Sequence, residues 1–270
     1  MMPTLHRIVA LSILVAGLAL GLAHFRESGV RAAAGQTSPV VVELFTSEGC
    51  SSCPPADALL ARLSEQRAIA NVEVIALEEH VDYWNDLGWS DPFSSRDWTN
   101  RQYMYAGPLG NGNPYTPQMV VDGSVEFSGN RAQDALKSIA EAAQRSKSPV
   151  TLSEGSSGKP GKEEFSVTVG KLLDGEKNGT ADVWVAITES GLYSAVKAGE
   201  NAGHELHHAA IVRSMRKIGE AKGGGEASFS GQAMISLRPE WKRENLRAVV
   251  FVQEKKTLKV VGAAQISLRS

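Results

Sequence analysis

The sequence has very few cysteines, with only Cys50 and Cys53 in 270 residues. An exported chain that relies on disulfides for its stability spreads its cysteines over long loops. A bridge between these two closes a ring of about four residues, which stabilises a fold by about 2 kcal/mol or less. The pair is therefore a poor structural disulfide, and redox chemistry or a shared metal is left to explain it.

Excess charge is also missing, because 28 Lys and Arg oppose 30 Asp and Glu and leave a formal net charge of -2. Nucleic acids and anionic lipids select strongly basic surfaces, so we predict no nucleic-acid partner. Hydrophobic residues make up 42% of the chain and charged residues 21%, close to the averages of globular proteins. The composition therefore supports a sizeable core.

The longest apolar run extends from Ile8 to Ala23 and follows a weakly positive start at His6 and Arg7. Small residues at Ala32–Ala34 provide a cleavage site of the kind that exported proteins carry. The run is slightly shorter than the roughly 20 residues that span a membrane. We therefore predict that residues 1–34 are a signal peptide and that the protein is periplasmic or secreted. The alternative is that this segment stays uncleaved as an N-terminal anchor. Only in that case do we predict that the protein associates with a membrane.

The next segment has the pattern of a strand, a helix and a second strand. Val40–Phe45 is a β-branched run that ends in a turn cluster, and Val72–Leu77 is a second apolar run. Between them, apolar residues from Ala56 to Leu63 recur with helical spacing, which predicts a helix that starts at about Ser51 or Ser52. This order predicts a parallel β-α-β unit.

Further segments complete two predicted domains. Residues 80–114 are rich in aromatic side chains and indicate a helical insertion. Residues 118–127 then predict a hairpin and residues 132–143 a closing helix. With the β-α-β unit, these segments make up a first predicted domain over residues 38–147. Short alternating runs separated by turn signals then predict an all-β, sandwich-like domain over residues 148–270. These runs are Phe165–Val169, Ala181–Ile187, Ala233–Leu237, Ala248–Val252 and Lys259–Ile266.

The Cys50-Ser51-Ser52-Cys53 segment is the strongest candidate for chemistry. The thiolate is the reactive form of cysteine, and the unpaired N–H groups of a helix N-terminus stabilise it. Cys50 is placed to act as the nucleophile, and Cys53, one turn later, to resolve the mixed disulfide. The alternatives are half of a zinc site and an inert disulfide. Zinc takes four ligands and the sequence has no second C-x-x-C, so we predict no metal and no cofactor except a redox-active disulfide.

Two segments resemble the thioredoxin superfamily: Val42–Phe45 leading to Cys50–Pro54, and Thr116-Pro117 leading into a strand. The resemblance implies a thioredoxin-like α/β fold in which Pro117 forms a cis peptide bond beside the sulfurs and shapes the substrate groove. It also implies that Glu43, one residue out of register, is a buried carboxylate that helps to deprotonate Cys53. A solvent-facing strand end is the alternative for Glu43. The chain departs from the superfamily at Gly49, where tryptophan is usual.

A longer set of motifs is similar to DUF1223, a family of exported bacterial proteins of unassigned function. The resemblance covers roughly residues 38–270 and implies the fold but no activity. The matching motifs are Glu43–Asp57, His80–Asn85, Leu87–Trp89, Arg101-Gln102 and Tyr115–Gly123.

Candidate substrate-binding residues follow the predicted strands. In an open α/β sheet the carboxyl ends of the strands face the ligand crevice, and the aromatic insertion begins there. It offers an apolar cap over Cys50, with His80 as a proton shuttle, whereas ordinary packing of a long loop is the alternative. Thr116 offers backbone pairing to a substrate. The predicted substrate-binding residues are Tyr115, Thr116, His80, Asp82, Tyr83 and Trp84.

A competing motif, His204-Glu205-Leu206-His207-His208, has the H-E-x-x-H order of zinc peptidases. That chemistry needs a helix with His204 and His208 on one face, and a third ligand. Glycines precede the motif and its neighbourhood has strand patterns, so we favour a surface loop.

The sequence thus predicts an exported thiol–disulfide oxidoreductase that acts through Cys50 and Cys53. Its predicted partners are exported thiol- or disulfide-containing proteins or small thiols, with a redox partner that the sequence does not identify. A non-catalytic ligand- or protein-binding module on the same fold is the first alternative, and a zinc peptidase the second.

Overall fold

A computed structural model of the chain describes residues 37–65, 69–110, 112–173, 179–225 and 227–268. The predicted signal peptide, residues 1–34, lies outside the described residues. Within the described ranges, no helix has the length and apolar character to cross a membrane. The elements in chain order are β1 (Ser38–Thr46), α1 (Pro54–Glu65), β2 (Val72–His80), α2 (Arg96–Ala106), β3 (Gln118–Val121), β4 (Val125–Ser128), α3 (Ala132–Ala143), β5 (Val150–Glu154), β6 (Lys162–Gly170), β7 (Thr180–Glu189), β8 (Leu192–Ala195), β9 (Glu205–His208), β10 (Ile211–Lys222), β11 (Ala227–Ser236), the 3-10 helix η1 (Arg243–Asn245), β12 (Leu246–Glu254) and β13 (Val260–Ser267).

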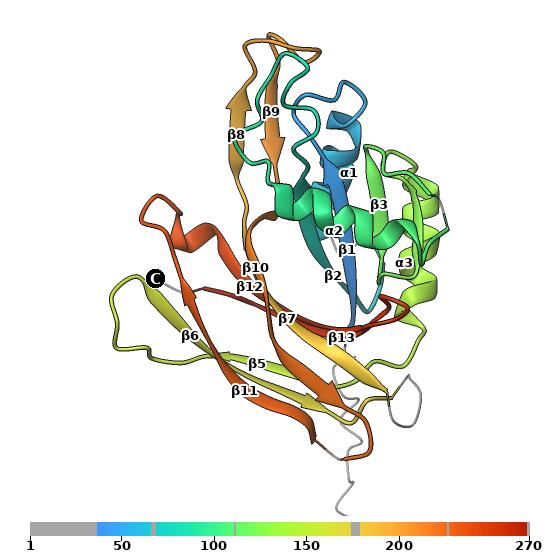
Figure 1. Cartoon of the computed structure of the whole chain (residues 1–270), viewed down its shortest axis with the longest axis vertical. Coiled ribbons are helices and arrows are strands. Elements are labelled where there is room, and N and C mark those ends of the chain that lie inside the picture. Colours follow the sequence, from blue (N-terminus) through green and yellow to red (C-terminus); the bar gives the residue numbers. More distant parts are fainter. Residues whose placement is uncertain (1–36, 66–68, 111, 174–178, 226, 269–270) are drawn as a thin grey trace, which may run out of the picture. The chain divides into compact units, whose positions relative to one another are not determined.

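Eight strands form one mixed sheet in the order β13-β12-β7-β10-β2-β1-β3-β4 (Figure 1). Strand β1 lies parallel to β2, and β10 pairs parallel with β2 where Ile211 faces Glu78. The other neighbouring strands of this sheet are antiparallel. Strands β11, β6 and β5 form a second sheet, and β8 and β9 form a separate hairpin.

The predicted fold class, a thioredoxin-like α/β domain followed by a sandwich-like domain, is wrong. The protein is mostly β, and the described residues contain only three α-helices. Strands from residues 180–267 join strands from residues 38–128 in one sheet. The physical reason is that β2 has a free edge of N–H and C=O groups, which β10 covers. The predicted boundary between residues 147 and 148 stays a prediction.

Local elements of the prediction are confirmed. The β1-α1-β2 unit is parallel, β3 and β4 form the hairpin, and α3 follows it. The five C-terminal runs are the cores of β6, β7, β11, β12 and β13. Period-two burial in strands and one-sided burial in helices are local properties, so short windows of sequence identify them.

Different elements pack on the two faces of the large sheet. Helices α1 and α3 pack on one face, against alternate β1 residues such as Val42 and Leu44, and the three-stranded sheet covers the strands of the C-terminal half on that face. Helix α2 packs on the other face through Trp98 and Tyr105. Successive residues of a strand point to opposite faces of the sheet. Each buried polar residue of β1 and β2 therefore lies either on the face packed by α1 and α3 or on the face packed by α2.

Candidate functional site

Cys50 and Cys53 form a disulfide directly before α1. The helix begins at Pro54, later than predicted, because its first bonds run from the N–H groups of Ala56 and Asp57 to the carbonyl oxygen of Cys53, at 2.8 and 3.1 Å. Cys53, and not Cys50, therefore adjoins the helix N-terminus. Cys50 lies one turn earlier, where its carbonyl oxygen accepts a hydrogen bond from the Cys53 N–H at 3.1 Å.

The disulfide is buried, with Cys50 1% exposed and Cys53 0% exposed. The loop between β8 and β9 covers it: the Asn201 side-chain nitrogen donates to the carbonyl oxygens of Glu48 and Cys50, at 2.8 and 3.0 Å. Glu200 in the same loop accepts a hydrogen bond from the Ser51 N–H at 3.0 Å. Figure 1 shows this hairpin beside the loop that leads into α1. The β8–β9 loop is thus bonded to the backbone of the disulfide segment at three points.

The aromatic insertion packs against the disulfide loop through Trp84. A Cβ atom placed on Gly49 would lie 3.1 Å from the Trp84 Cβ atom, so the missing side chain at Gly49 makes room for Trp84. The Trp84 indole nitrogen donates to the Thr116 hydroxyl at 2.8 Å. The Thr116–Pro117 bond is cis, as the resemblance implied. Pro117 and Ala56 of α1 both lie against the backbone of Gly129, which places Pro117 beside the first turn of α1.

Three other predicted substrate-binding side chains make hydrogen bonds within the fold. The Tyr83 hydroxyl donates to Gln102 at 3.1 Å and the Tyr115 hydroxyl to Glu126 at 2.5 Å. Asp82 accepts a hydrogen bond from the Thr99 hydroxyl at 2.6 Å. These contacts join the insertion to α2 and β4, and a role in substrate binding stays a prediction.

Glu43 lies on the face of the sheet opposite to the disulfide. Its carboxylate accepts hydrogen bonds from Arg101 Nε and the Tyr105 hydroxyl of α2, both at 2.5 Å, and it is fully buried. Helix α1 and Cys53 lie on the other face. The prediction that Glu43 assists Cys53 does not match this position, because one residue of register moves a strand side chain to the opposite face.

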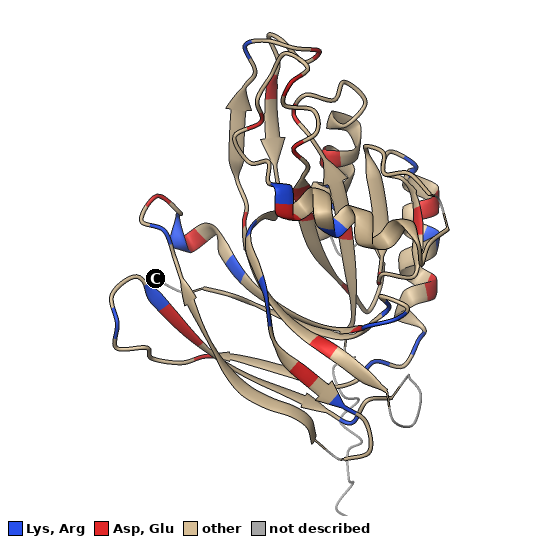
Figure 2. Ribbon diagram, in the orientation of Figure 1, with Lys and Arg blue, Asp and Glu red and all other residues tan. Residues whose placement is uncertain are grey.

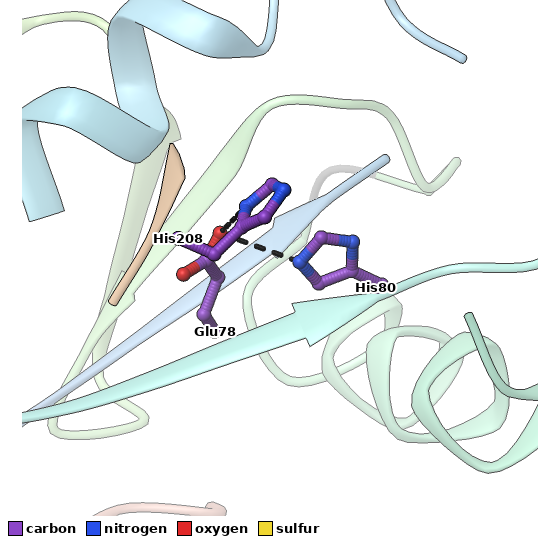
Figure 3. Close-up of side chains that lie close together, drawn as sticks. All are labelled: Glu78, His80 and His208. Atoms are coloured by element: carbon purple, nitrogen blue, oxygen red, sulfur yellow. Dashed lines mark hydrogen bonds and ion pairs between the residues drawn. The ribbon is translucent and has the colours of Figure 1, made fainter. Parts of the chain in front are cut away.

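Glu78, His80 and His208 form a buried cluster of one carboxylate and two imidazoles (Figure 3). Glu78 Oε1 is 2.8 Å from His208 Nδ1 and 3.3 Å from His80 Nε2. Glu78 Oε2 accepts a hydrogen bond from the Ala209 N–H at 2.9 Å, which fixes the carboxylate plane. Glu78 and His80 come from the end of β2, and His208 from the end of β9.

Two more carboxylates face the outer nitrogens of the imidazoles. Asp91 Oδ2 is 2.7 Å from His80 Nδ1, and Glu48 Oε1 is 3.1 Å from His208 Nε2. Burial alone lowers the pKa of an imidazole, but Asp91 outweighs it and holds the pKa of His80 well above its usual value. Likewise, Glu78 and Glu48 outweigh burial and raise the pKa of His208 to about 9.

Acidic segments, red in Figure 2, lie on the loops beside α1 and the β8–β9 hairpin.

Asp57 adds a titratable group on the disulfide side of the sheet. It is 4% exposed, it follows Cys53 by four residues on α1, and it accepts a hydrogen bond from the Thr46 hydroxyl at 2.6 Å. Residues four apart share one face of a helix. Burial and the Glu78 carboxylate raise the pKa of Asp57 to about 7. The sequence analysis missed Asp57, although its spacing from Cys53 was visible.

The zinc-peptidase reading is wrong because residues 205–208 form strand β9 and not a helix. The strand exposes His207 and buries His208, so His204 and His208 do not form the helical pair which that chemistry needs. His208 instead joins Glu78 and His80. The sequence analysis missed Glu78, although it precedes His80 by two residues on the same face of β2. It also missed Glu48 and Asp91, which tertiary packing brings to the imidazoles.

One comparison with known proteins identifies a family. A family model described as "Protein of unknown function (DUF1223)" matches residues 41–253. No curated protein matches the chain. The crystal structure of a protein from Agrobacterium tumefaciens is similar, with 28% sequence identity, a TM-score of 0.62, and coverage of 86% of this chain and 95% of that one. HBP35 of Porphyromonas gingivalis is similar in fold, with 17% identity, a TM-score of 0.60, and coverage of 86% and 76%.

Proposed function

The chain belongs to the DUF1223 family, and from that premise we propose that Cys50 and Cys53 carry out thiol–disulfide exchange. The observation that carries the proposal is a disulfide at the N-terminus of α1. A helix N-terminus stabilises a thiolate, and a bridge across so short a ring adds little to stability. These two properties favour a reactive pair over a structural one.

The exchange is balanced in atoms and electrons. A substrate thiolate attacks one sulfur of the oxidised pair, the Cys50–Cys53 bond breaks, and a mixed disulfide forms. A second substrate thiol then displaces the protein, so the substrate loses two electrons and two protons and both cysteines become thiols. The reverse sequence reduces a substrate disulfide. Exported thiol- or disulfide-containing proteins or small thiols are the proposed substrates.

Asp57, in place of Glu43, is the proposed proton carrier for Cys53. A carboxyl group with a pKa of about 7 gives up and takes up a proton near neutral pH. It lies one turn beyond Cys53, and its backbone N–H donates to the Cys53 carbonyl oxygen at 3.1 Å. It would supply the proton that the Cys53 thiolate takes up when the disulfide breaks, and would remove it again when the disulfide forms.

A non-catalytic binding module is the second candidate, and the near-complete burial of Cys50 favours it. Reduction of insulin in the presence of dithiothreitol separates the two. We expect the wild type to accelerate the reduction, Cys50→Ser to abolish that acceleration, and Ser51→Ala, at an exposed neighbour, to keep it. If the wild type is no faster than dithiothreitol alone, the exchange proposal fails and the binding module stands.

A further inference from the structure

We propose that Glu78, His80 and His208 bind one divalent transition-metal ion of the Zn²⁺ class beneath the disulfide loop. The sequence predicted no metal, because its only cysteine pair lacks further cysteine ligands. The three side chains here come from β2 and β9, and the tertiary fold alone brings them together. Each offers a ligand atom, and these three atoms lie within 4.8 Å of one another.

The spacing of the donor atoms suits direct coordination. Donors bound to zinc at about 2.0–2.1 Å in a tetrahedral site lie about 3.3 Å apart. Glu78 Oε1 is 3.3 Å from His80 Nε2 and 2.8 Å from His208 Nδ1, so small side-chain shifts would open the space for an ion (Figure 3). Two imidazoles and one carboxylate are a donor set that suits Zn²⁺ and its neighbours better than Mg²⁺ or Ca²⁺.

The hydrogen-bonding pattern of the cluster calls for positive charge on the imidazoles or between them. A carboxylate has no hydrogen to donate, and Glu78 Oε1 faces a ring nitrogen of both His80 and His208. The other nitrogen of each ring already faces a second carboxylate, that of Asp91 or Glu48. The inner nitrogens therefore need either an extra proton on each ring or one shared metal ion.

The surroundings match the outer shell of known metal sites. Histidine ligands usually donate their second N–H to a carboxylate, which fixes the ring orientation and strengthens the ligand. Asp91 and Glu48 occupy these positions. Phe93 packs its ring against both imidazoles, with centroids at 5.6 and 5.5 Å, and so forms an apolar wall. Three protein ligands leave a fourth coordination position for water or a small ligand.

Metal titration of the full chain tests the proposal. The disulfide is kept oxidised and the absence of free thiols is verified, so that neither cysteine can bind the ion. After treatment with a chelator, we expect one Zn²⁺ per chain with a dissociation constant of about 1 μM or tighter. His208→Gln and Glu78→Gln should weaken binding by more than about 100-fold, because they remove ligands and not outer-shell partners. His207→Gln, on the same strand but exposed, should bind as the wild type does.

Two results overturn the proposal: a wild type that binds no stoichiometric Zn²⁺, or equal losses in His207→Gln and His208→Gln. In either case protons occupy the cluster. If the ligand variants fail to fold, the wild type still decides the matter through Co²⁺. We expect visible d–d bands without a thiolate charge-transfer band, and X-ray absorption should find only nitrogen and oxygen donors. Sulfur in the coordination shell, or no Co²⁺ spectrum, would refute the site, whatever the outcome of the insulin assay.

Discussion

Asn201→Ala tests whether the β8–β9 loop controls access to the disulfide. The Asn201 side chain is buried and donates to the carbonyl oxygens of Glu48 and Cys50, on either side of the Gly49 backbone. The substitution removes both bonds and leaves the hairpin strands unchanged. If thiol reagents reach Cys50 only when the loop opens, the variant should be reduced faster.

The magnitude follows from the two hydrogen bonds, at 2.8 and 3.0 Å. Each contributes about 0.5–1.5 kcal/mol net, so their loss favours opening by about 1–3 kcal/mol. Since about 1.4 kcal/mol is a tenfold change, the open population should rise about 5–150-fold. When opening and closing are fast, the rate of reduction follows that population.

The assay is the rate at which dithiothreitol generates free thiols in the native, oxidised protein. Urea unfolding of the same samples shows whether global stability has changed. Lys197→Ala, at an exposed position of the same loop, is the matched control and should be reduced at the wild-type rate. Equal rates for wild type and Asn201→Ala would refute the reasoning, and so would equal acceleration in both variants.

Three further predictions concern stability and metal binding. Burial, Glu78, His80, His208 and the Thr46 hydroxyl set the pKa of Asp57, which rises from 3.8 unfolded to about 7 folded. The folded state therefore holds a proton that the unfolded state has lost, and the contribution of Asp57 to the unfolding free energy should fall by up to about 4 kcal/mol as pH rises from about 4 to 7. Asp57→Asn should flatten this slope in pH-dependent urea titrations, and an unchanged slope would contradict the assignment. Arg101→Leu should lower the unfolding free energy by about 3–5 kcal/mol in urea titrations, because it leaves the buried Glu43 carboxylate without its cationic partner. The control Arg96→Leu changes a residue of the same helix that is 75% exposed, and it should lower the unfolding free energy little. Similar losses in the two variants would contradict the prediction. Glu48→Gln should weaken Zn²⁺ binding about 10–100-fold in the metal titration described above, and undiminished affinity would show that Glu48 does not orient His208.

Part of the fold follows from local sequence. The β-branched run at Val40–Phe45, the helical spacing from Ala56 to Leu63 and the alternating runs after residue 160 all form the predicted elements. Each depends on side-chain periodicity within a single window, which does not need the rest of the chain. The position of the cysteine pair just before a helix follows for the same reason.

The arrangement of the sheet could not be predicted in this way. Strand β10 has no two-residue burial pattern, since its buried residues lie only near the two ends of Ile211–Lys222, and none of the predicted runs covers it. Its pairing with β2 at Ile211 and Glu78 joins distant parts of the chain. The resemblance to the thioredoxin superfamily rested on segments around Cys50 and Pro117, and these say nothing about which strands extend the sheet.

The sequence by itself determined many of the elements, the cysteine pair and the family; the tertiary structure alone decided what surrounds them. The backbone of the buried Cys50 is bonded by Asn201, 151 residues away. The imidazole of His208 meets Glu78 and Glu48 across 130 and 160 residues. Such contacts depend on long-range packing, because a charged group is buried at an acceptable free-energy cost only when an opposite charge or a hydrogen-bond partner is buried beside it. No local pattern in the chain encodes those partners.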